Sequence, residues 1–127
     1  MELKPVAMYR EMYERGHDEL PSVLDVTTGT VEDDRDQILN YMRKVRAIFD
    51  VMGEAPDLFT TGVDIEGGPS LYSDGVWIWR EDSLKYLAER PIALPAEFIE
   101  RVRSFDYVPQ QFDTRDPDFD AAFLSYF

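Results

Sequence analysis

The dipeptide Asp74-Gly75 lies between two short apolar runs and places the strongest constraint on how this chain folds. Asp-Gly suits a two-residue hairpin turn, because both central residues of such a turn need a positive φ. The run that follows, residues 76–79, is β-branched or aromatic and contains both tryptophans of the chain. The pattern predicts an antiparallel hairpin in which residues 71–72 pair with residues 76–79. Because an isolated hairpin is marginal in water, we expect helices to cover it.

Four other stretches have the apolar spacing and boundary residues of helices, namely residues 1–16, 31–52, 80–90 and 95–105. The stretch 31–52 is the clearest, and we expect it to form the central helix of the core. Its apolar stripe consists of Ile38, Met42, Val45, Phe49 and Met52. Together these patterns predict an α+β fold, in which a mainly helical single domain of about four helices packs around a small antiparallel β-hairpin.

The connecting segments carry weaker signals. Residues 17–31 are expected to be a connector. Residues 53–70 contain several glycines and prolines and are expected to form a long loop. Val63 and Ile65 alternate with polar neighbours there, which indicates a brief strand.

The C-terminal segment, residues 106–127, belongs to the same single domain (1–127) but differs in composition. Five aspartates face one base, Arg115, and are interleaved with phenylalanine and tyrosine. Aromatic residues are unusual in a disordered tail. The segment therefore either docks its rings on the body of the protein or forms an exposed binding arm, and docking is the favoured alternative.

Acidic residues outnumber basic ones by 26 to 13, which gives a net charge of −13. Such a surface repels nucleic acid and anionic membranes, and it can steer a basic partner toward the protein. Hydrophobic residues make up 44 % of the chain, enough for a core, and the absence of cysteine excludes disulfides and thiolate metal sites. The chain shows no secretion signal and no apolar run long enough for a membrane span, so a cytoplasmic location is expected.

No motif typical of an enzyme, a metal site or a cofactor site is present, so we expect no catalytic residue and no cofactor. The single histidine, His17, is expected to be a solvated turn residue. Asp116, Asp118 and Asp120 have the spacing that opens a calcium loop, but Ala121 and Phe127 occupy the positions where such a loop needs glycine and glutamate. Calcium binding is therefore not expected.

The stretch from Gly67 to about Val102 contains the order Gly-Gly-Pro-Ser-Leu-x-x-Asp-Gly-x-Trp-x-Trp, followed by Leu-Pro-x-Glu-Phe at residues 94–98. It resembles a group of small uncharacterised bacterial proteins with a similar C-terminal segment, some of which lie in gene neighbourhoods suggestive of toxin–immunity pairs. Arg80 stands where that group is expected to have proline. The resemblance implies no catalytic residues, but it favours an immunity protein.

The charge and the lack of a catalytic pattern favour a binding protein, most concretely an immunity-type inhibitor that occludes the basic cleft of a toxin or effector. Charge complementarity would raise the rate of capture. Trp77 or Trp79 would supply an aromatic anchor if one faces outward, although at least one is expected in the core. The candidate acidic contacts are Glu32, Asp33, Asp34, Asp36, Asp57, Asp64, Glu66, Asp74, Asp116, Asp118 and Asp120.

One close variant of this hypothesis and two alternatives from other functional classes stay open. A nucleic-acid mimic that blocks a defence protein would carry acids spaced like phosphates on one surface. A small enzyme or ligand-binding domain would have a pocket between the hairpin and the central helix. An assembly subunit would show a large apolar patch.

Overall fold

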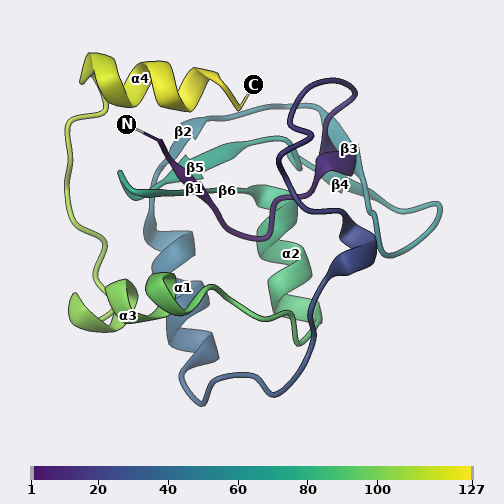
Figure 1. The fold of residues 1–127 in the computed structure, drawn as a ribbon, viewed down its shortest axis with the longest axis horizontal. Coiled ribbons are helices and arrows are strands. Elements are labelled where there is room, and N and C mark those ends of the chain that lie inside the picture. The colour runs from purple at the N-terminus through teal and green to yellow at the C-terminus, as the bar shows by residue number, and fades with distance from the viewer. Residues whose placement is uncertain (1, 127) are drawn as a thin grey trace.

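The computed structural model describes residues 2–126, and over these residues it shows an α+β fold (Figure 1). The number of helices is four, as predicted, although one of them lies in the C-terminal segment and not in residues 1–16. Helices account for 34 % of residues and strands for 16 %, so the prediction of a mainly helical domain is wrong. The elements are β1 (Lys4–Pro5), α1 (Arg35–Lys44), β2 (Ala47–Phe49), β3 (Glu54–Pro56), β4 (Asp64–Glu66), β5 (Leu71–Ser73), β6 (Trp77–Arg80), α2 (Glu81–Glu89), α3 (Ala96–Ser104) and α4 (Pro117–Leu124), with 3₁₀ turns at Arg10–Met12 and Val23–Asp25.

The predicted hairpin forms the centre of a four-stranded sheet with the order β1-β6-β5-β2. β5 and β6 are antiparallel, with Tyr72 opposite Trp79, as the sequence predicts. The turn differs in detail, because Gly75 has a φ of +96° whereas Asp74 does not have a positive φ. Asp74 instead closes the turn with its side chain, whose Oδ1 accepts N–H bonds from Val76 and Trp77 at 3.0 and 2.8 Å.

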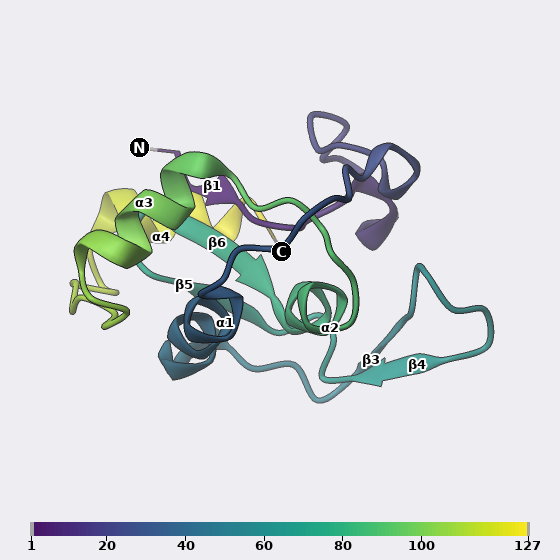
Figure 2. The same cartoon turned by 90° about the horizontal axis from the view of Figure 1, so that it is seen from below.

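Alternation along β6 separates two cores, one on each face of the sheet. Trp77 and Trp79 point to one face, where they pack with residues of α1, α2 and α3. Ile78 points to the other face, where it packs with Leu71, the N-terminal segment and α4. The sheet is therefore covered on both faces, as the view from below shows (Figure 2).

The predicted helix over residues 1–16 is wrong. β1 runs parallel to β6, with the N–H groups of Lys4 and Val6 donating to the carbonyls of Val76 and Ile78 at 2.9 and 2.8 Å. Ala7 has a φ of +49°, which an α-helix does not permit. The methionines and tyrosines of this segment supply core residues without a helix, because the backbone is held at the edge of the sheet.

The predicted central helix over residues 31–52 is too long, because α1 covers only Arg35–Lys44. The backbone becomes extended at Val45, and β2 then pairs with β5. Ile38 and Met42 are buried as expected, but Met52 is 97 % exposed. A β-branched and aromatic run suits an edge strand as well as a helix, and pairing with β5 decides between the two.

The expected loop over residues 53–70 contains a second hairpin. β3 and β4 are antiparallel and form a separate sheet, and Figure 2 shows them extending away from the helices. β4 confirms the brief strand expected around Ile65, although Val63 precedes it. Gly68 packs against this hairpin so closely that a Cβ there would lie 2.7 Å from the Cβ of Ala55.

The C-terminal segment is docked, in agreement with the favoured alternative. α4 begins where the Asp116 carboxylate accepts the N–H of Phe119 at 3.0 Å and Pro117 occupies the first helical position. Phe119 and Phe123 are 2 % and 4 % exposed. Residues 108–116, here called the strap, connect α3 to α4 without forming a helix or strand.

The two other predicted helices, over residues 80–90 and 95–105, are confirmed as α2 and α3.

Candidate functional site

Both tryptophans are buried, which confirms that at least one lies in the core, and neither meets the condition of facing outward that an aromatic anchor requires. Trp77 is 6 % exposed and Trp79 is fully buried. Their rings meet the ring of Phe98 in α3 at centroid distances of 5.4 and 5.9 Å. They share one face of β6, and helices cover that face.

Asp74 is also a structural residue. It is 2 % exposed, and its Oδ2 accepts the Tyr41 hydroxyl at 2.7 Å and the Arg101 Nε–H at 3.0 Å. Burial raises the pKa of Tyr41, and the bond to Asp74 raises it further. With both carboxylate oxygens engaged, Asp74 has no capacity left for a partner.

Asp57 and Asp34 are paired within the fold. Asp57 is 7 % exposed and accepts a 2.7 Å bond from the Nζ of Lys85. Burial is the largest single influence and raises the pKa of the Asp57 carboxyl, but the Lys85 contact and the N–H bonds from Phe59 and Thr60 together outweigh it and lower that pKa. The Asp34 carboxylate accepts two 2.8 Å bonds from Arg103 and one from Tyr107, which hold its pKa far below the usual value, the Arg103 bonds contributing most.

The other candidate acids lie in three separate parts of the molecule (Figures 1 and 2). Glu32 is paired with Arg35 at 3.1 Å, and Asp116 caps α4. The candidates that stay exposed without an ion pair among residues 2–126 are Asp33 and Asp36 at the start of α1, Asp64 and Glu66 on β4, and Asp118 and Asp120 on α4. The structure therefore does not join the predicted acids into one surface.

The projecting β3–β4 hairpin holds the densest of these groups. Glu54, Asp64 and Glu66, here called the hairpin acids, are all exposed, whereas Ala55 and Ile65 point to the opposite side and are buried. Glu54 lies directly opposite Glu66 in the register. Sequence reasoning missed Glu54, although the alternation of Glu54, Ala55 and Pro56 is a period-2 signal that could have revealed it.

A groove with a volume of about 740 Å³ lies beside this hairpin, here called the acid-rimmed groove. Its lining includes the apolar residues Met12, Tyr13, Val51 and Leu71, and it reaches Glu54. Its other charged lining residues are Glu11, Glu14, Arg15 and Arg80. Among these, Arg80 is already neutralised by Asp82, which accepts its Nε–H and an Nη–H at 3.0 and 2.8 Å.

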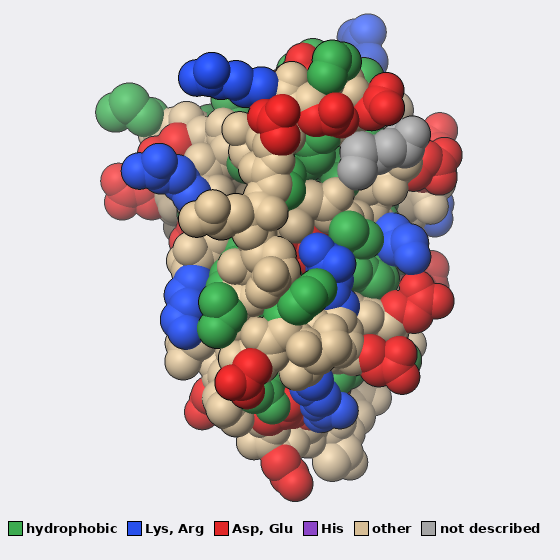
Figure 3. Space-filling model, turned by 90° about the vertical axis from the view of Figure 1, so that its left-hand side faces the viewer, with side chains coloured by type: hydrophobic (Ala, Val, Ile, Leu, Met, Phe, Trp, Pro, Cys, Tyr) green, Lys and Arg blue, Asp and Glu red, His purple; other side chains and the backbone are tan. Residues whose placement is uncertain are grey.

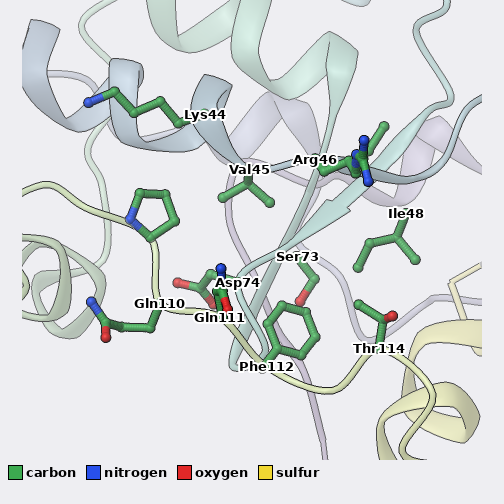
Figure 4. A pocket seen from close by; sticks show the side chains of 12 residues that line it. Lys44, Val45, Arg46, Ile48, Ser73, Asp74, Gln110, Gln111, Phe112 and Thr114 are labelled. Carbon is green, nitrogen blue, oxygen red and sulfur yellow. The ribbon is translucent and has the colours of Figure 1, made fainter.

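A second cavity, with a volume of about 610 Å³, lies between the α1–β2 corner and the strap (Figure 4). It is here called the strap cavity. It lies beside the hairpin turn, where the ligand-pocket alternative places a pocket. Its lining residues are Lys44, Val45, Arg46, Ala47, Ile48, Ser73, Asp74, Pro109, Gln110, Gln111, Phe112 and Thr114. Figure 3 shows the face of the molecule toward α4, where basic side chains stand among apolar ones in the middle and acids gather at the upper end.

The prediction that His17 is a solvated turn residue is wrong in part, because its backbone has the positive φ of a turn, +60°, but its side chain is only 12 % exposed. Its ring lies against the rings of Tyr13 and Tyr126 at centroid distances of 4.1 and 5.3 Å, and its Nδ1 lies 3.1 Å from the carboxylate of Glu19. No group of three or more potential metal-ligating His, Cys, Asp or Glu side chains occurs within residues 2–126. No helix in that range is long and apolar enough to cross a membrane.

Comparison with known proteins gives no relative: no protein-family model, no curated protein and no solved structure matches the chain.

Proposed function

We propose that this protein is an acidic binding protein that captures a partner with a basic surface, most concretely an immunity-type inhibitor that occludes a basic toxin or effector. The observation that carries the proposal is the placement of Glu54 opposite Glu66 on a projecting hairpin. Within residues 2–126 no lysine or arginine forms an ion pair with either glutamate.

Like charges placed directly opposite each other destabilise a pair of strands, by up to about 1 kcal/mol. A lysine or arginine from a partner, inserted between the two glutamates, would replace this repulsion by attraction. Asp64 adds a third carboxylate on the same hairpin. The free protein therefore carries a local electrostatic cost that a basic partner removes.

The acid-rimmed groove supplies the apolar contact that an acidic surface alone lacks. Specific interfaces combine a desolvated apolar centre with a polar rim. Tyr13, Val51 and Leu71 line the groove, and Glu54 joins it to the hairpin. Met52, which is 97 % exposed, lies at the start of the hairpin. The aliphatic stem of a partner's lysine or arginine would pack in the groove while its charged end meets the acids.

The distribution of acids favours this proposal over a nucleic-acid mimic. A mimic needs a continuous row of carboxylates, whereas the exposed acids lie at the start of α1, on the β3–β4 hairpin and on α4 (Figure 2). An inhibitor needs only one complementary patch, and the hairpin acids with the groove form such a patch.

Affinity capture from a lysate of the producing cells tests the proposal when three matched proteins are compared. The hairpin variant is Glu54→Gln/Asp64→Asn/Glu66→Gln. The control variant is Asp33→Asn/Asp36→Asn/Asp118→Asn, which removes the same number of charges elsewhere. We expect one basic protein on the wild type and the control at low salt, less of it at moderate salt, and little on the hairpin variant.

The captured protein is then purified and its activity is assayed with increasing amounts of wild type and hairpin variant. Inhibition by the wild type and weak inhibition by the hairpin variant would support the inhibitor. Equal capture by all three proteins would show that the hairpin is not the binding surface. Capture without inhibition would show that the protein binds this partner but does not inhibit it.

A further inference from the structure

We propose that the strap cavity binds a small organic anion with a flat apolar body, and that Arg46 holds its negative group. This site is separate from the hairpin acids and does not depend on the proposed inhibitor function. The cavity lies between the end of α1, the edge strand β2 and the strap (Figure 4).

The charge of the cavity is opposite to that of the molecule. Lys44 and Arg46 line it, and neither side chain has an ion pair or hydrogen bond within residues 2–126, in a chain with twice as many acids as bases. Lys44 lies in the last turn of α1, where the helix dipole favours a cation. Figure 4 also shows its amino group directed away from the other lining side chains. Arg46 lies beyond the helix end, is exposed and has no carboxylate partner within residues 2–126, so its guanidinium is available to an anion in this cavity.

The only carboxylate in the lining cannot oppose an anion strongly. Asp74 is 2 % exposed, and the guanidinium of Arg101 contacts its Oδ2 at 3.0 Å. Its Oδ1 accepts the N–H groups of Val76 and Trp77. The negative charge of Asp74 is therefore balanced by four hydrogen bonds, one of them from a cation, before a ligand arrives.

The strap offers further donors. The side chains of Gln111 and Thr114 line the cavity and have no hydrogen-bond partner within the described chain. The backbone N–H groups of Gln111, Phe112 and Thr114 likewise find no acceptor among residues 2–126. An anion beside Arg46 has amide and hydroxyl donors within the same cavity, which is the composition that recognises a carboxylate, sulfonate or phosphate group.

The rest of the wall is apolar and fits a flat body. Val45, Ile48 and the ring of Phe112 line the cavity. In Figure 4, Arg46 and Ile48 stand on one side and Phe112 and Thr114 on the other. A volume of about 610 Å³ lies within the range of small-molecule sites. The ring of Phe112 is fixed by its edge-to-face contact with Phe119 at 4.9 Å, so this wall exists before a ligand binds.

Two fluorescent probes that differ in charge test the site. 1-Anilinonaphthalene-8-sulfonate carries a sulfonate on a flat aromatic body, and N-phenyl-1-naphthylamine is the same body without it. Each is titrated into the wild type, into Arg46→Gln and into the matched control Arg43→Gln, which loses the same charge three residues earlier in the chain and does not line the cavity. Backbone amide chemical shifts locate the bound sulfonate probe, and circular dichroism confirms that each variant is folded.

We expect the wild type to bind the sulfonate probe more tightly than the neutral probe. Arg46→Gln should weaken sulfonate binding about tenfold, the effect of losing a charge-assisted hydrogen bond, and Arg43→Gln should leave it nearly unchanged. Shift changes should centre on Ser73, Gln111 and Thr114. Equal binding of both probes, no effect of Arg46→Gln, no binding of the sulfonate, or shift changes at Tyr13 and Ala55 in the acid-rimmed groove would each overturn the proposal.

Discussion

The hydroxyl of Tyr41 donates a 2.7 Å hydrogen bond to the carboxylate of Asp74, and this contact joins α1 to the turn between β5 and β6. Arg101 of α3 contacts the same carboxylate at 3.0 Å. Two helices and the central hairpin therefore meet at one buried acid, which the sequence shows only as the first residue of a turn.

Replacing this acid should destabilise the fold strongly. Asp74→Ala leaves the Tyr41 hydroxyl and the Arg101 guanidinium without their partner and opens the turn, so we expect a loss of about 3 kcal/mol in the free energy of unfolding. Urea unfolding measures it, with Asp36→Ala on exposed helix surface as the control. A loss for Asp74→Ala no larger than that of the control would show that the buried network contributes little.

The turn glycine is required for two separate reasons, which a double mutant separates. Gly75 has a φ of +96°, and a Cβ there would lie 3.0 Å from the Cγ of Phe112. Gly75→Ala should cost about 1–3 kcal/mol from backbone strain, together with the steric conflict. In the background of Phe112→Ala the same change should cost less, because only the strain remains.

Gly29→Ala is the matched control for the turn glycine, since a Cβ at Gly29 meets no atom within 4 Å and Gly29 has no positive φ. It should change the unfolding free energy little. If Gly75→Ala costs the same with and without Phe112, the strap does not press on the turn.

The docked C-terminal helix should contribute a large part of the stability. Phe119→Ala removes a ring that is 2 % exposed and packs on the second face of the sheet, and we expect a loss of about 3–4 kcal/mol. Leu124→Ala, on the same helix but 51 % exposed, should change the stability by less than about 1 kcal/mol. Urea unfolding and limited proteolysis report the two effects, and equal values would mean that α4 is not packed as described.

Acid should destabilise the protein in part through Asp34. Its bonds to Arg103 and Tyr107 hold its pKa far below the usual value in the folded state. The unfolded chain therefore binds a proton at Asp34 more readily than the folded protein does, and stability is lost as the pH falls through and below about 4, the ordinary pKa of an aspartate. Asp34→Asn should show a smaller fall in the urea midpoint between pH 6 and pH 3 than the wild type.

Asp33→Asn provides the comparison for that acid dependence, because Asp33 is adjacent and exposed. The urea midpoint of Asp33→Asn should fall between pH 6 and pH 3 by about as much as that of the wild type. Identical pH profiles for the wild type and Asp34→Asn would contradict the role given to the Arg103 contact.

The parts of the fold that depend on local signals could be predicted from the sequence. The β5–β6 hairpin follows from a turn dipeptide between strand-forming runs, and α2 and α3 follow from apolar spacing bounded by prolines. The prediction of a helix in the N-terminal segment was wrong because β1 pairs with β6, which lies more than seventy residues away in the sequence. The register, with Lys4 opposite Trp77, shows this pairing. The methionines and tyrosines of this segment fit a helical stripe equally well, and only the distant partner strand decides the outcome.

The candidate site was harder to predict, because exposure of an acid depends on its distant partners. Asp57 and Asp74 look like surface acids in the sequence, but Lys85 and Arg101 pair with them in the fold. Trp77 and Trp79 share a face of β6, as period-2 alternation predicts, yet only the packing of α3 reveals that this face is covered. Glu54 was missed because only the pairing of β3 with β4, which the sequence does not show, places it opposite Glu66.

The hairpin acids should reduce the stability of the free protein, a cost consistent with a binding surface. Glu66→Gln removes the repulsion across the strands, so the free energy of unfolding should rise by a few tenths of a kcal/mol. The same substitution should weaken binding to the captured partner. Asp36→Asn, an exposed acid without an ion pair in the described residues, should do neither.

The rate of association with the captured partner, measured by stopped-flow mixing over a range of salt concentrations, tests the central claim most directly. We predict that the rate constant for the wild type falls steeply with salt and that Glu54→Gln/Glu66→Gln associates more slowly with a flatter dependence, because steering by the hairpin is lost. The control Asp33→Asn/Asp36→Asn should stay close to the wild type. A rate constant that is the same for all three proteins at every salt concentration would contradict the account.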